Sequence, residues 1–443
     1  MTLPHFDRHL QTLSQRWENA LAFAGCDAAV VAAGTPAPYF LDDQSAPFRP
    51  NPHFGQWFPD RDCAHALLLI RPGSRPHLFF HQPRDYWHQP PAVPEWAPGH
   101  LDVSPHDDLD ALERAVSAAT RTINRVAWVG ERPPGNLGAF QHNPPLLLNH
   151  LHFDRAVKTD FEVACLAEAA ARATAGHLAA RDAFAAGASE FQTHLRYLLA
   201  ADQSEAELPY PSIVAHNTHA GVLHYQHYER TPPQPLRSLL IDAGATARLY
   251  AADVTRTYAA AGVANGDRFQ ALIDAMDIAQ QRLIADIRPG INYLAVHEAA
   301  HQTVGALLAE HGIVRCSAES AVDSGLTRTF LPHGVGHLIG LQTHDVGGQQ
   351  RSVEGGQRPP PPAYPALRLT RDVTPGQVFT IEPGLYFIPM LLDEAANGPL
   401  RDEIDWETVA ALAPFGGIRI EDNVLVTEDG VRNLTRDAFA RHG

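Results

Sequence analysis

Short apolar runs and helical patterns alternate along the first third of the chain. Apolar residues at helical spacing predict a helix over residues 107–121. Alternation of strands with helices is typical of an α/β domain. The strands are predicted from four apolar runs, which read CDAAVVAAG, AHALLLIRPG, RPHLFFHQ and RVAWVG.

The pattern changes near residue 155, where we place a domain boundary. Thr159 and Glu162 have capping-box spacing, and an alanine-rich helix is predicted from there to about residue 186. Two more helices are predicted at about 267–288 and 293–312. The remaining runs alternate and carry glycine turns, which favours an antiparallel sheet and hence an α+β domain over residues 156–443. These runs read LRSLLIDAG, RLYAADVTRTYAAAG, QVFTIEPGLYF and GGIRIEDNVLVT.

Charge and composition exclude several classes of partner. The formal net charge of the 443 residues is −16, so we expect no binding to nucleic acid or to an anionic membrane surface, which both need a positive field. No apolar run is long enough for a membrane span, and the N-terminal segment lacks the pattern of a signal peptide. The 4 cysteines are scattered, which favours free thiols in a reducing, cytoplasmic compartment.

Four carboxylates interrupt the apolar strands of the second part. A hairpin that turned midway between Asp242 and Asp253, at 247–248, would place these two carboxylates opposite one another. Glu382 and Glu421 each follow directly after an apolar run. A buried carboxylate is unfavourable without a cation or strong donors.

A single carboxylate of this kind is more simply a salt bridge or an edge-strand charge that faces water. Four such carboxylates together favour a site for divalent cations. Carboxylates with an imidazole suit manganese, cobalt or zinc. Because four carboxylates carry four negative charges, the number of groups favours two divalent ions.

The segment HGVGHLIGLQTHDVGG, residues 333–348, supplies three candidate imidazoles: His333, His337 and His344. The zinc-protease motif H-E-x-x-H also places two histidines four residues apart on a helix. Gly334 stands where that motif has its glutamate, and two glycines weaken a helix, so we exclude the motif. Spacing alone does not assign the three histidines.

The order of these motifs resembles that of the pita-bread metallopeptidases, the family of methionine aminopeptidase, aminopeptidase P, prolidase and creatinase. Shared features are D-x10-D, HGxGH followed by HD, a glutamate in EPG and a glutamate in RIED. Other segments resemble the bacterial Xaa-Pro dipeptidase (prolidase) subgroup, which includes organophosphorus acid anhydrolases. These segments are NPHFGQWFPD, QPRDYWH, LPYPSIVAHN, LHYQH, PPPPAYP and GGIRIEDNVLV.

The resemblance implies a fold and a set of cofactors. Residues 156–443 would form the pita-bread catalytic domain, and residues 1–155 would form an α/β domain that contributes to a homodimer and covers the pocket. Two divalent metal ions are implied, manganese in most of the subgroup, with cobalt or zinc as alternatives. Their implied ligands are Asp242, Asp253, His337, Glu382 and Glu421.

The resemblance also implies substrate contacts. His333, Arg419, Tyr210 and Tyr293 are expected to line the substrate pocket. A free proline carboxylate needs a cationic partner, which Arg419 with His333 or His344 could supply. Two plainer alternatives stay open: Arg419 could only neutralise Glu421 or Asp422, and His224 could be one of many surface histidines among the 25 in the chain.

The implied reaction is hydrolysis of the bond before proline in an Xaa-Pro dipeptide. A hydroxide that bridges the metals would attack, Glu382 would act as general base, and His344 or His224 would stabilise the oxyanion. Thr255 and Thr257 are most simply strand residues, though one of them could donate a hydrogen bond to a ligating carboxylate.

Three alternatives share these motifs. They are an aminopeptidase P-type enzyme acting on longer Xaa-Pro-Yaa peptides, a hydrolase of organophosphorus esters, and a metal-free binding module. One segment departs from the subgroup, which has an acidic residue where this chain has Ser45 and Ala46. In the subgroup that residue reaches the substrate amine of the neighbouring subunit, and Asp42 or Asp43 could do so in its place.

Overall fold

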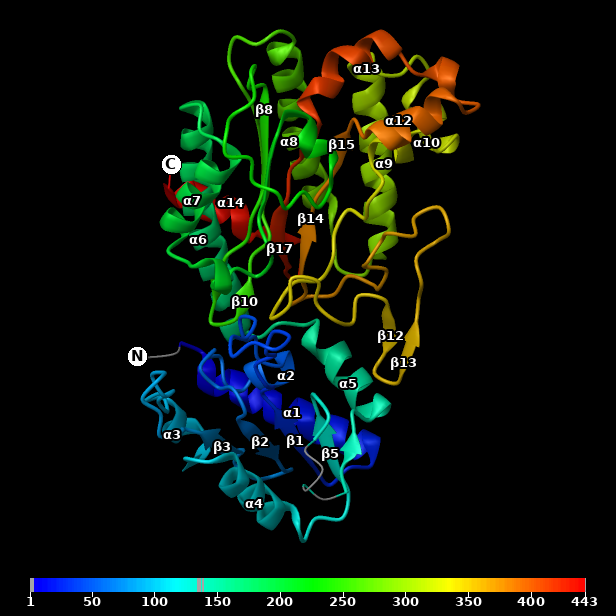
Figure 1. The fold of residues 1–443 in the computed structure, drawn as a ribbon. Helices are drawn as coiled ribbons and strands as arrows, with labels where there is room; N and C mark the ends of the chain where they lie inside the picture. The colour runs from blue at the N-terminus through cyan, green and yellow to red at the C-terminus, as the bar shows by residue number, and fades with distance from the viewer. Residues whose placement is uncertain (1–3, 134–136, 138, 443) are drawn as a thin grey trace. The chain divides into compact units, whose positions relative to one another are not determined.

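The computed structural model describes residues 4–133, 137 and 139–442, which form two compact units (Figure 1). The first unit comprises Met1–Glu162 with Gln350–Gly356, and the second comprises Val163–Gln349 with Gln357–Gly443. Assignment of the segment 350–356 to the first unit was not predicted. Its contacts there include a hydrogen bond of 2.7 Å from Gln350 Nε2 to the carbonyl oxygen of Asn149.

A six-stranded mixed sheet forms the centre of the first unit, in the order β4-β3-β2-β1-β5-β6. The four predicted strands are confirmed as β1, β2, β3 and β5. The edge strands β4 and β6 were missed because their exposed residues form no apolar run. The helix predicted over 107–121 is confirmed as α4. The helices are α1 (Phe6–Ala24), α2 (Pro52–Gly55), α3 (Ala97–His100), α4 (Leu109–Thr120) and α5 (Pro145–Arg155), and the strands are β1 (Ala28–Ala32), β2 (Leu67–Ile70), β3 (His77–His81), β4 (Asp102–His106), β5 (Val126–Val129), β6 (Gln141–His142) and, in the added segment, β12 (Gln350–Ser352).

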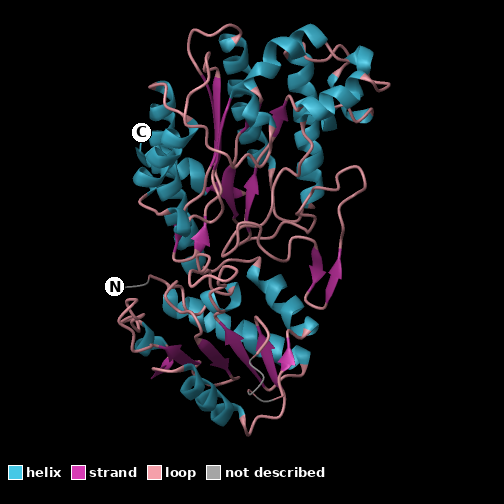
Figure 2. Cartoon of the chain, viewed as in Figure 1, coloured by secondary structure: helices cyan, strands magenta, loops and turns pink. Residues whose placement is uncertain are grey.

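Both faces of this sheet are covered, which explains why β1 is apolar throughout. On one face Val31 packs into a cluster with Trp17 of α1 and Leu151 of α5. On the other face Val30 packs with Leu112 of α4. Figure 2 shows the strands of this unit between these helices.

Antiparallel strands form the centre of the second unit, as predicted. One sheet has the order β11-β8-β7, a second has β14-β17-β18, and β15 pairs with β16. An isolated bridge between Thr255 and Glu421 joins the first two sheets. The strands are β7 (Ile213–His216), β8 (Ser238–Asp242), β9 (Thr246–Ala247), β10 (Tyr250–Ala251), β11 (Thr255–Ala259), β13 (Gly355–Gln357, which begins in the first unit), β14 (Val378–Ile381), β15 (Gly384–Tyr386), β16 (Gly417–Arg419), β17 (Asp422–Val426) and β18 (Val431–Asn433).

Helices cover these sheets (Figures 1 and 2). Phe184 of α6 and Tyr197 of α7 pack against Ile241 of β8, while Leu240 on the other face of that strand packs against Tyr386. The helices are α6 (Asp160–Ala185, which begins in the first unit), α7 (Glu190–Ala201), α8 (Gly266–Asp286), α9 (Tyr293–Glu310), α10 (Ala318–Asp323), α11 (Thr327–Phe330), α12 (Pro389–Ala396), α13 (Trp406–Leu412) and α14 (Leu434–His442), with short 3-10 turns at Glu205–Glu207, Asn217–Gly221, Arg401–Glu403 and Ala413–Phe415.

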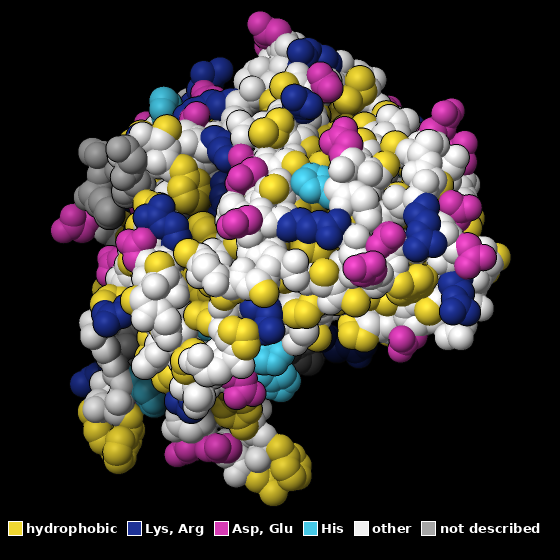
Figure 3. All heavy atoms as spheres, turned by 90° about the horizontal axis from the view of Figure 1, so that it is seen from above, with side chains coloured by type: hydrophobic (Ala, Val, Ile, Leu, Met, Phe, Trp, Pro, Cys, Tyr) yellow, Lys and Arg dark blue, Asp and Glu magenta, His cyan; other side chains and the backbone are white. Residues whose placement is uncertain are grey.

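The surface carries charges of both signs. On the face shown in Figure 3, basic and acidic side chains are interspersed rather than gathered into one patch of either sign. This face therefore lacks the continuous positive field that a phosphate backbone requires. Among the helices that the structure describes, none is long and apolar enough to cross a membrane.

Candidate metal centre

Three buried side chains in the second unit place their donor atoms together. One donor atom each of Asp253, His337 and Glu421 lies within 4.8 Å of the other two. Asp253 lies between β10 and β11, His337 between α11 and β12, and Glu421 between β16 and β17. The cluster is therefore assembled from segments far apart in the chain.

Asp242 and Asp253 share one side of a hairpin, but they do not lie directly opposite each other. The strand partner of Asp242 is Thr255. This register follows from the turn, which is formed by Arg248 and Leu249, whereas the prediction placed it at 247–248. Both turn residues have positive φ, 48° and 73°. Asp253 is therefore two positions from direct register with Asp242, a diagonal spacing that keeps both side chains on one face.

The hydroxyl of Tyr210 joins the two carboxylates. It lies 2.7 Å from Oδ1 of Asp242 and 2.5 Å from Oδ1 of Asp253. A phenol has a single proton to donate. The tyrosine proton can satisfy only one of the two carboxylates, so the other needs a proton of its own or a bound cation. The arrangement therefore fits a cation-binding site.

The imidazole of His337 is oriented for metal binding. Its Nδ1 donates a hydrogen bond of 3.0 Å to the carbonyl oxygen of Leu338. That bond occupies Nδ1 and leaves Nε2 facing the carboxylates, where it could bind a metal ion. Nε2 faces Oδ2 of Asp253 at 3.4 Å and Oε1 of Glu382 at 3.8 Å.

Glu421, which is buried, and Glu382, which is partly buried, are the other two carboxylates of the cluster. Burial raises the pKa of Glu382 to about 7, although the charges of His337 and Arg419 oppose this shift. Burial, followed by the charges of Asp253 and Glu382, raises the pKa of Glu421 well above its usual value. Oε2 of Glu421 accepts a hydrogen bond of 2.7 Å from the hydroxyl of Thr255.

The donor set fits two divalent ions. Burial raises the pKa of Asp242, whereas hydrogen bonding and charge from His337 outweigh burial and lower that of Asp253. Carboxylates so close together need protons or cations. Oxygen donors with one imidazole suit manganese, cobalt and zinc.

The HGVGH segment lies outside any helix, which confirms that it is not a zinc-binding helix. The Thr380 N–H donates to the carbonyl oxygen of His337 at 2.9 Å, and the Glu382 N–H donates to that of Val335 at 2.9 Å. A Cβ atom on Gly336 would lie 2.0 Å from the carbonyl oxygen of Thr380. The glycine therefore allows the close pairing with β14 that brings His337 beside Glu382.

Arg419 donates hydrogen bonds to three protein groups. Its Nη2 donates to Oδ2 of Asp242 at 2.7 Å, Nη1 to the hydroxyl of Tyr386 at 2.9 Å, and Nε to the hydroxyl of Thr255 at 3.2 Å. The carboxylate that pairs with Arg419 is therefore Asp242. The sequence alternative, in which Arg419 neutralises Glu421 or Asp422, is wrong about the partner. Asp422 is instead paired with Arg256 and Arg436, at 2.7 and 2.8 Å.

His333 continues this network. Its Nδ1 donates to the carbonyl oxygen of Gly334 at 2.8 Å, so Nε2 accepts from the hydroxyl of Tyr386 at 2.8 Å. Burial, followed by the charge of Arg419, lowers the pKa of His333 to about 3. The ring is therefore neutral near pH 7, and its Nδ1 lies 3.6 Å from Oε2 of Glu382.

The other predicted pocket residues differ in position. The ring of His344 lies edge-on to that of His337, with centroids 4.4 Å apart. His224 is exposed, and its charge influences the pKa of both His333 and His344. Tyr293 is fully buried and donates its hydroxyl to the carbonyl oxygen of Thr380 at 2.9 Å, a position that does not support its prediction as a substrate contact.

Sequence reasoning missed two residues that position the cluster. Tyr386 is four residues after Glu382 in the EPGLY segment. In a strand this even spacing places both side chains on one face, which could have indicated its role. The side chain of Asn423 holds the backbone of Asp253: its Oδ1 accepts from the Asp253 N–H at 3.0 Å, and its Nδ2 donates to the Asp253 carbonyl oxygen at 2.6 Å.

Asp42 and Asp43 lie in an exposed turn of the first unit, where Asp42 accepts a hydrogen bond from the Gln44 N–H.

Two family models match the chain. The model described as metallopeptidase family M24 matches residues 164–428. The model described as the N-terminal domain of Xaa-Pro dipeptidase matches residues 4–153.

Curated relatives span the whole chain. A protein named Xaa-Pro dipeptidase from Stenotrophomonas maltophilia (strain K279a) is 45% identical over 437 residues, which are 98% of this chain and 97% of that protein. Another of the same name from Xanthomonas axonopodis pv. citri is 44% identical over 437 residues, 98% of each chain.

Solved structures of aminopeptidase P share the fold. Pseudomonas aeruginosa aminopeptidase PepP superposes with a TM-score of 0.72 and 22% identity, covering 98% of each chain. Escherichia coli aminopeptidase P with the inhibitor Pro-Leu has a TM-score of 0.73 and 21% identity, covering 99% of this chain and 96% of that one. These likenesses confirm the predicted pita-bread fold.

Proposed function

The chain belongs to metallopeptidase family M24, and we propose that it is an Xaa-Pro dipeptidase that hydrolyses the bond before a C-terminal proline. Full-length identity of 45% to a protein of that name supports the substrate class. The observation that carries the proposed chemistry is the carboxylate cluster, in which one hydroxyl lies between two carboxylates and an imidazole nitrogen faces a third.

Two divalent metal ions would be held by this cluster. When bound, they would lower the pKa of a water molecule and polarise the scissile carbonyl group. We propose manganese, with cobalt or zinc as alternatives, because the donors are mainly oxygen. The proposed ligands are Asp242, Asp253, His337, Glu382 and Glu421.

Glu382 is the proposed general base. Its carboxylate lies between His337 and His333, 3.8 and 3.6 Å from their ring nitrogens. There it would take the proton of the attacking water and deliver it to the leaving proline nitrogen. This transfer is needed because the nitrogen of a tertiary amide leaves poorly without a proton.

Other side chains have supporting roles in the proposal. His344 and His224 would donate to the developing oxyanion. Arg419 and Tyr210 would orient Asp242 rather than contact substrate, since both already donate to it. His333 would form a wall of the pocket beside Glu382.

The test is an assay of Xaa-Pro dipeptides, Xaa-Pro-Yaa tripeptides and an organophosphorus ester, before and after chelation and manganese addition. We expect manganese-dependent cleavage of the dipeptides, and loss of at least about 100-fold in kcat for Glu382→Gln. Glu298→Gln, an exposed glutamate on α9, is the matched control. Activity on tripeptides alone would replace the dipeptidase with the aminopeptidase P alternative.

Two further proposals follow from the resemblance: a homodimer in the cytoplasm, and contact of Asp42 or Asp43 with the substrate amine. Size-exclusion chromatography with light scattering measures the mass of the protein in solution, and a monomeric mass would reject the homodimer. Asp42→Asn and Asp43→Asn test the second through the KM for dipeptides. Unchanged KM in both variants would remove these residues from the site.

A further inference from the structure

Glu190, the first residue of α7, is a buried carboxylate to which the proposed reaction gives no role. The residue is 0% exposed. Its Oε1 accepts from the His216 N–H at 2.8 Å and from Nδ1 of His219 at 2.7 Å. Its Oε2 accepts from the hydroxyl of Tyr225 at 2.8 Å and from the Glu229 N–H at 2.8 Å. An ionised carboxylate has about four acceptor positions and no proton to donate, so it satisfies all of these donors.

These hydrogen bonds close a loop at both of its ends. His216 is the last residue of β7, where the loop begins. Glu229 is where the chain returns to α7, and its carbonyl oxygen accepts from the Phe191 N–H at 3.1 Å. Compact loops whose ends lie close together often carry functional residues. The single side chain of Glu190 holds both ends of the loop 217–228.

The middle of the loop is fixed on either side of His224. Leu223 packs against the apolar cluster that contains Tyr386, and Tyr225 belongs to the same cluster. Burial, followed by the hydrogen bond to Glu190, raises the pKa of Tyr225, so its hydroxyl remains a donor near neutral pH. Glu190 therefore holds the residue next to His224 as well as the two ends of the loop.

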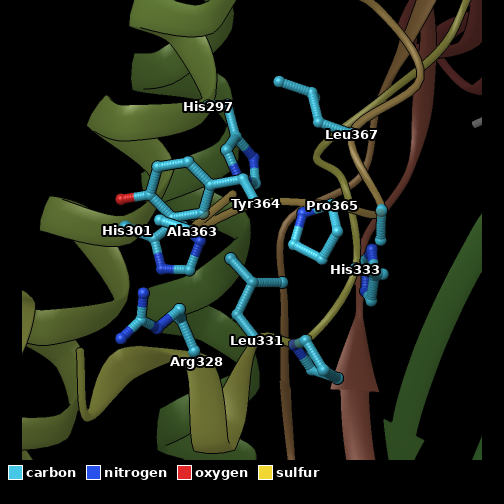
Figure 4. A pocket seen from close by; sticks show the side chains of 11 residues that line it. His297, His301, Arg328, Leu331, His333, Ala363, Tyr364, Pro365 and Leu367 are labelled. Atoms are coloured by element: carbon cyan, nitrogen blue, oxygen red, sulfur yellow. The ribbon is translucent and has the colours of Figure 1, made fainter. Parts of the chain in front are cut away.

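His224 itself is exposed and lies near the metal centre. Burial is the main cause of the lowered pKa values of His333 and His344, and the charge of His224 contributes to both. His333 lies 3.6 Å from Glu382 and lines a cavity of about 150 Å³. Figure 4 shows His333 on one side of this cavity and the histidines of the α9 sequence HEAAH, residues 297–301, on the other.

We infer that Glu190 is a positioning residue, which closes the loop 217–228 and thereby holds His224 at the metal centre. The role of His224 rests on the proposed function, in which it donates to the developing oxyanion. A displacement of about 1 Å in a reacting geometry can lower a rate about 100-fold. A loop that is held at both ends and beside the histidine limits such displacement before substrate binds.

An amide cannot replace this carboxylate without losing a hydrogen bond. In Glu190→Gln, the Nε2 group would face either the His216 N–H or the Glu229 N–H, so one of these backbone donors would lose its acceptor. One end of the loop should then open. Glu205→Gln is the matched control, because Glu205 also pairs with a histidine of α7, at 2.9 Å from Nε2 of His194, but holds neither end of the loop.

The kinetic test is a double-mutant cycle on the manganese-loaded protein with an Xaa-Pro dipeptide. We expect Glu190→Gln to lower kcat at least about 10-fold and to change KM and manganese affinity less than about 2-fold, since the lost contact serves the transition state. His224→Ala should lower kcat about 100-fold, and adding Glu190→Gln to it should lower kcat no further. Glu205→Gln should retain kcat. Tyr225→Phe removes a single donor and should give a smaller fall, which keeps the test open if Glu190→Gln does not fold.

Hydrogen exchange of the loop amides tests the closure separately from the chemistry. Exchange over residues 217–228 should be faster in Glu190→Gln and unchanged in Glu205→Gln. Wild-type exchange and kcat in both Glu190→Gln and Tyr225→Phe would overturn the inference. An equal fall in kcat from Glu190→Gln with and without His224→Ala would also overturn it. If His224→Ala keeps the wild-type kcat, the role of His224 in the proposed function is rejected, and the exchange rates by themselves then support or overturn closure of the loop by Glu190.

Discussion

Replacing Tyr210 with phenylalanine tests whether this side chain serves the metal ligands or the substrate. The change removes one hydroxyl and leaves the ring. In the structure that hydroxyl lies 2.7 Å from Asp242 and 2.5 Å from Asp253. Burial, followed by the charges of these two carboxylates, raises the pKa of Tyr210 well above its usual value, so it acts as a donor throughout the accessible pH range.

The expected effect follows from that geometry. The variant loses one hydrogen bond to a charged acceptor, because a single proton serves both carboxylates. Such a bond contributes about 1.5–3 kcal/mol. Its loss leaves the two carboxylates less well oriented, and metal affinity should fall by about 10- to 100-fold, the range for partners of metal ligands. At saturating manganese, KM should change little.

The assay is a competition titration of manganese against a fluorescent chelator, with activity measured at saturating metal. Tyr228→Phe is the matched control, since its hydroxyl donates to the carbonyl oxygen of Ser212 at 2.7 Å. Equal metal affinity in both variants and the wild type would refute the reasoning. A rise in KM alone would restore Tyr210 to the substrate pocket.

Three further predictions concern stability. Gly336→Ala should lower the free energy of unfolding by about 3 kcal/mol in urea titration, because its Cβ would meet the Thr380 carbonyl oxygen; an unchanged midpoint would contradict this. Burial lowers the pKa of His177 to about 3 from 6.5, so protonation below pH 6.5 favours the unfolded chain and should remove about 2 kcal/mol by pH 5; His177→Gln should lose that part of the acid sensitivity, and an equal fall in the variant would count against it. Chelation should lower the melting temperature by several degrees, since the buried carboxylates lose their cations, and manganese should restore it; no shift would speak against a metal-filled cluster.

Local patterns in the sequence predicted much of the fold. The capping box is present, with Glu162 accepting from the Thr159 N–H at 2.8 Å, and α8 ends at Asp286, before the Arg-Pro-Gly sequence. The apolar runs of β1, β2, β3 and β5 marked strands buried on both faces. Glycines within HGVGH correctly excluded a helix there.

Other features depended on which segments meet. The one-residue shift of the hairpin changed the partner of Asp242 to Thr255. Arg419 pairs with Asp242, a residue 177 positions away in the chain. Tyr293 is buried, with its hydroxyl donated to the carbonyl oxygen of Thr380, and the HEAAH histidines form a wall of a cavity.

The sequence by itself determined most of the elements, the class of fold and the carboxylates that need a cation, because apolar periodicity is a property of neighbouring residues. The tertiary structure alone decided that the hydroxyl of Tyr210 lies between two carboxylates, and that Arg419 and His333 donate hydrogen bonds to protein groups. These outcomes depend on distances between segments that no local spacing encodes, since a hydrogen-bond partner is set by how sheets and helices pack.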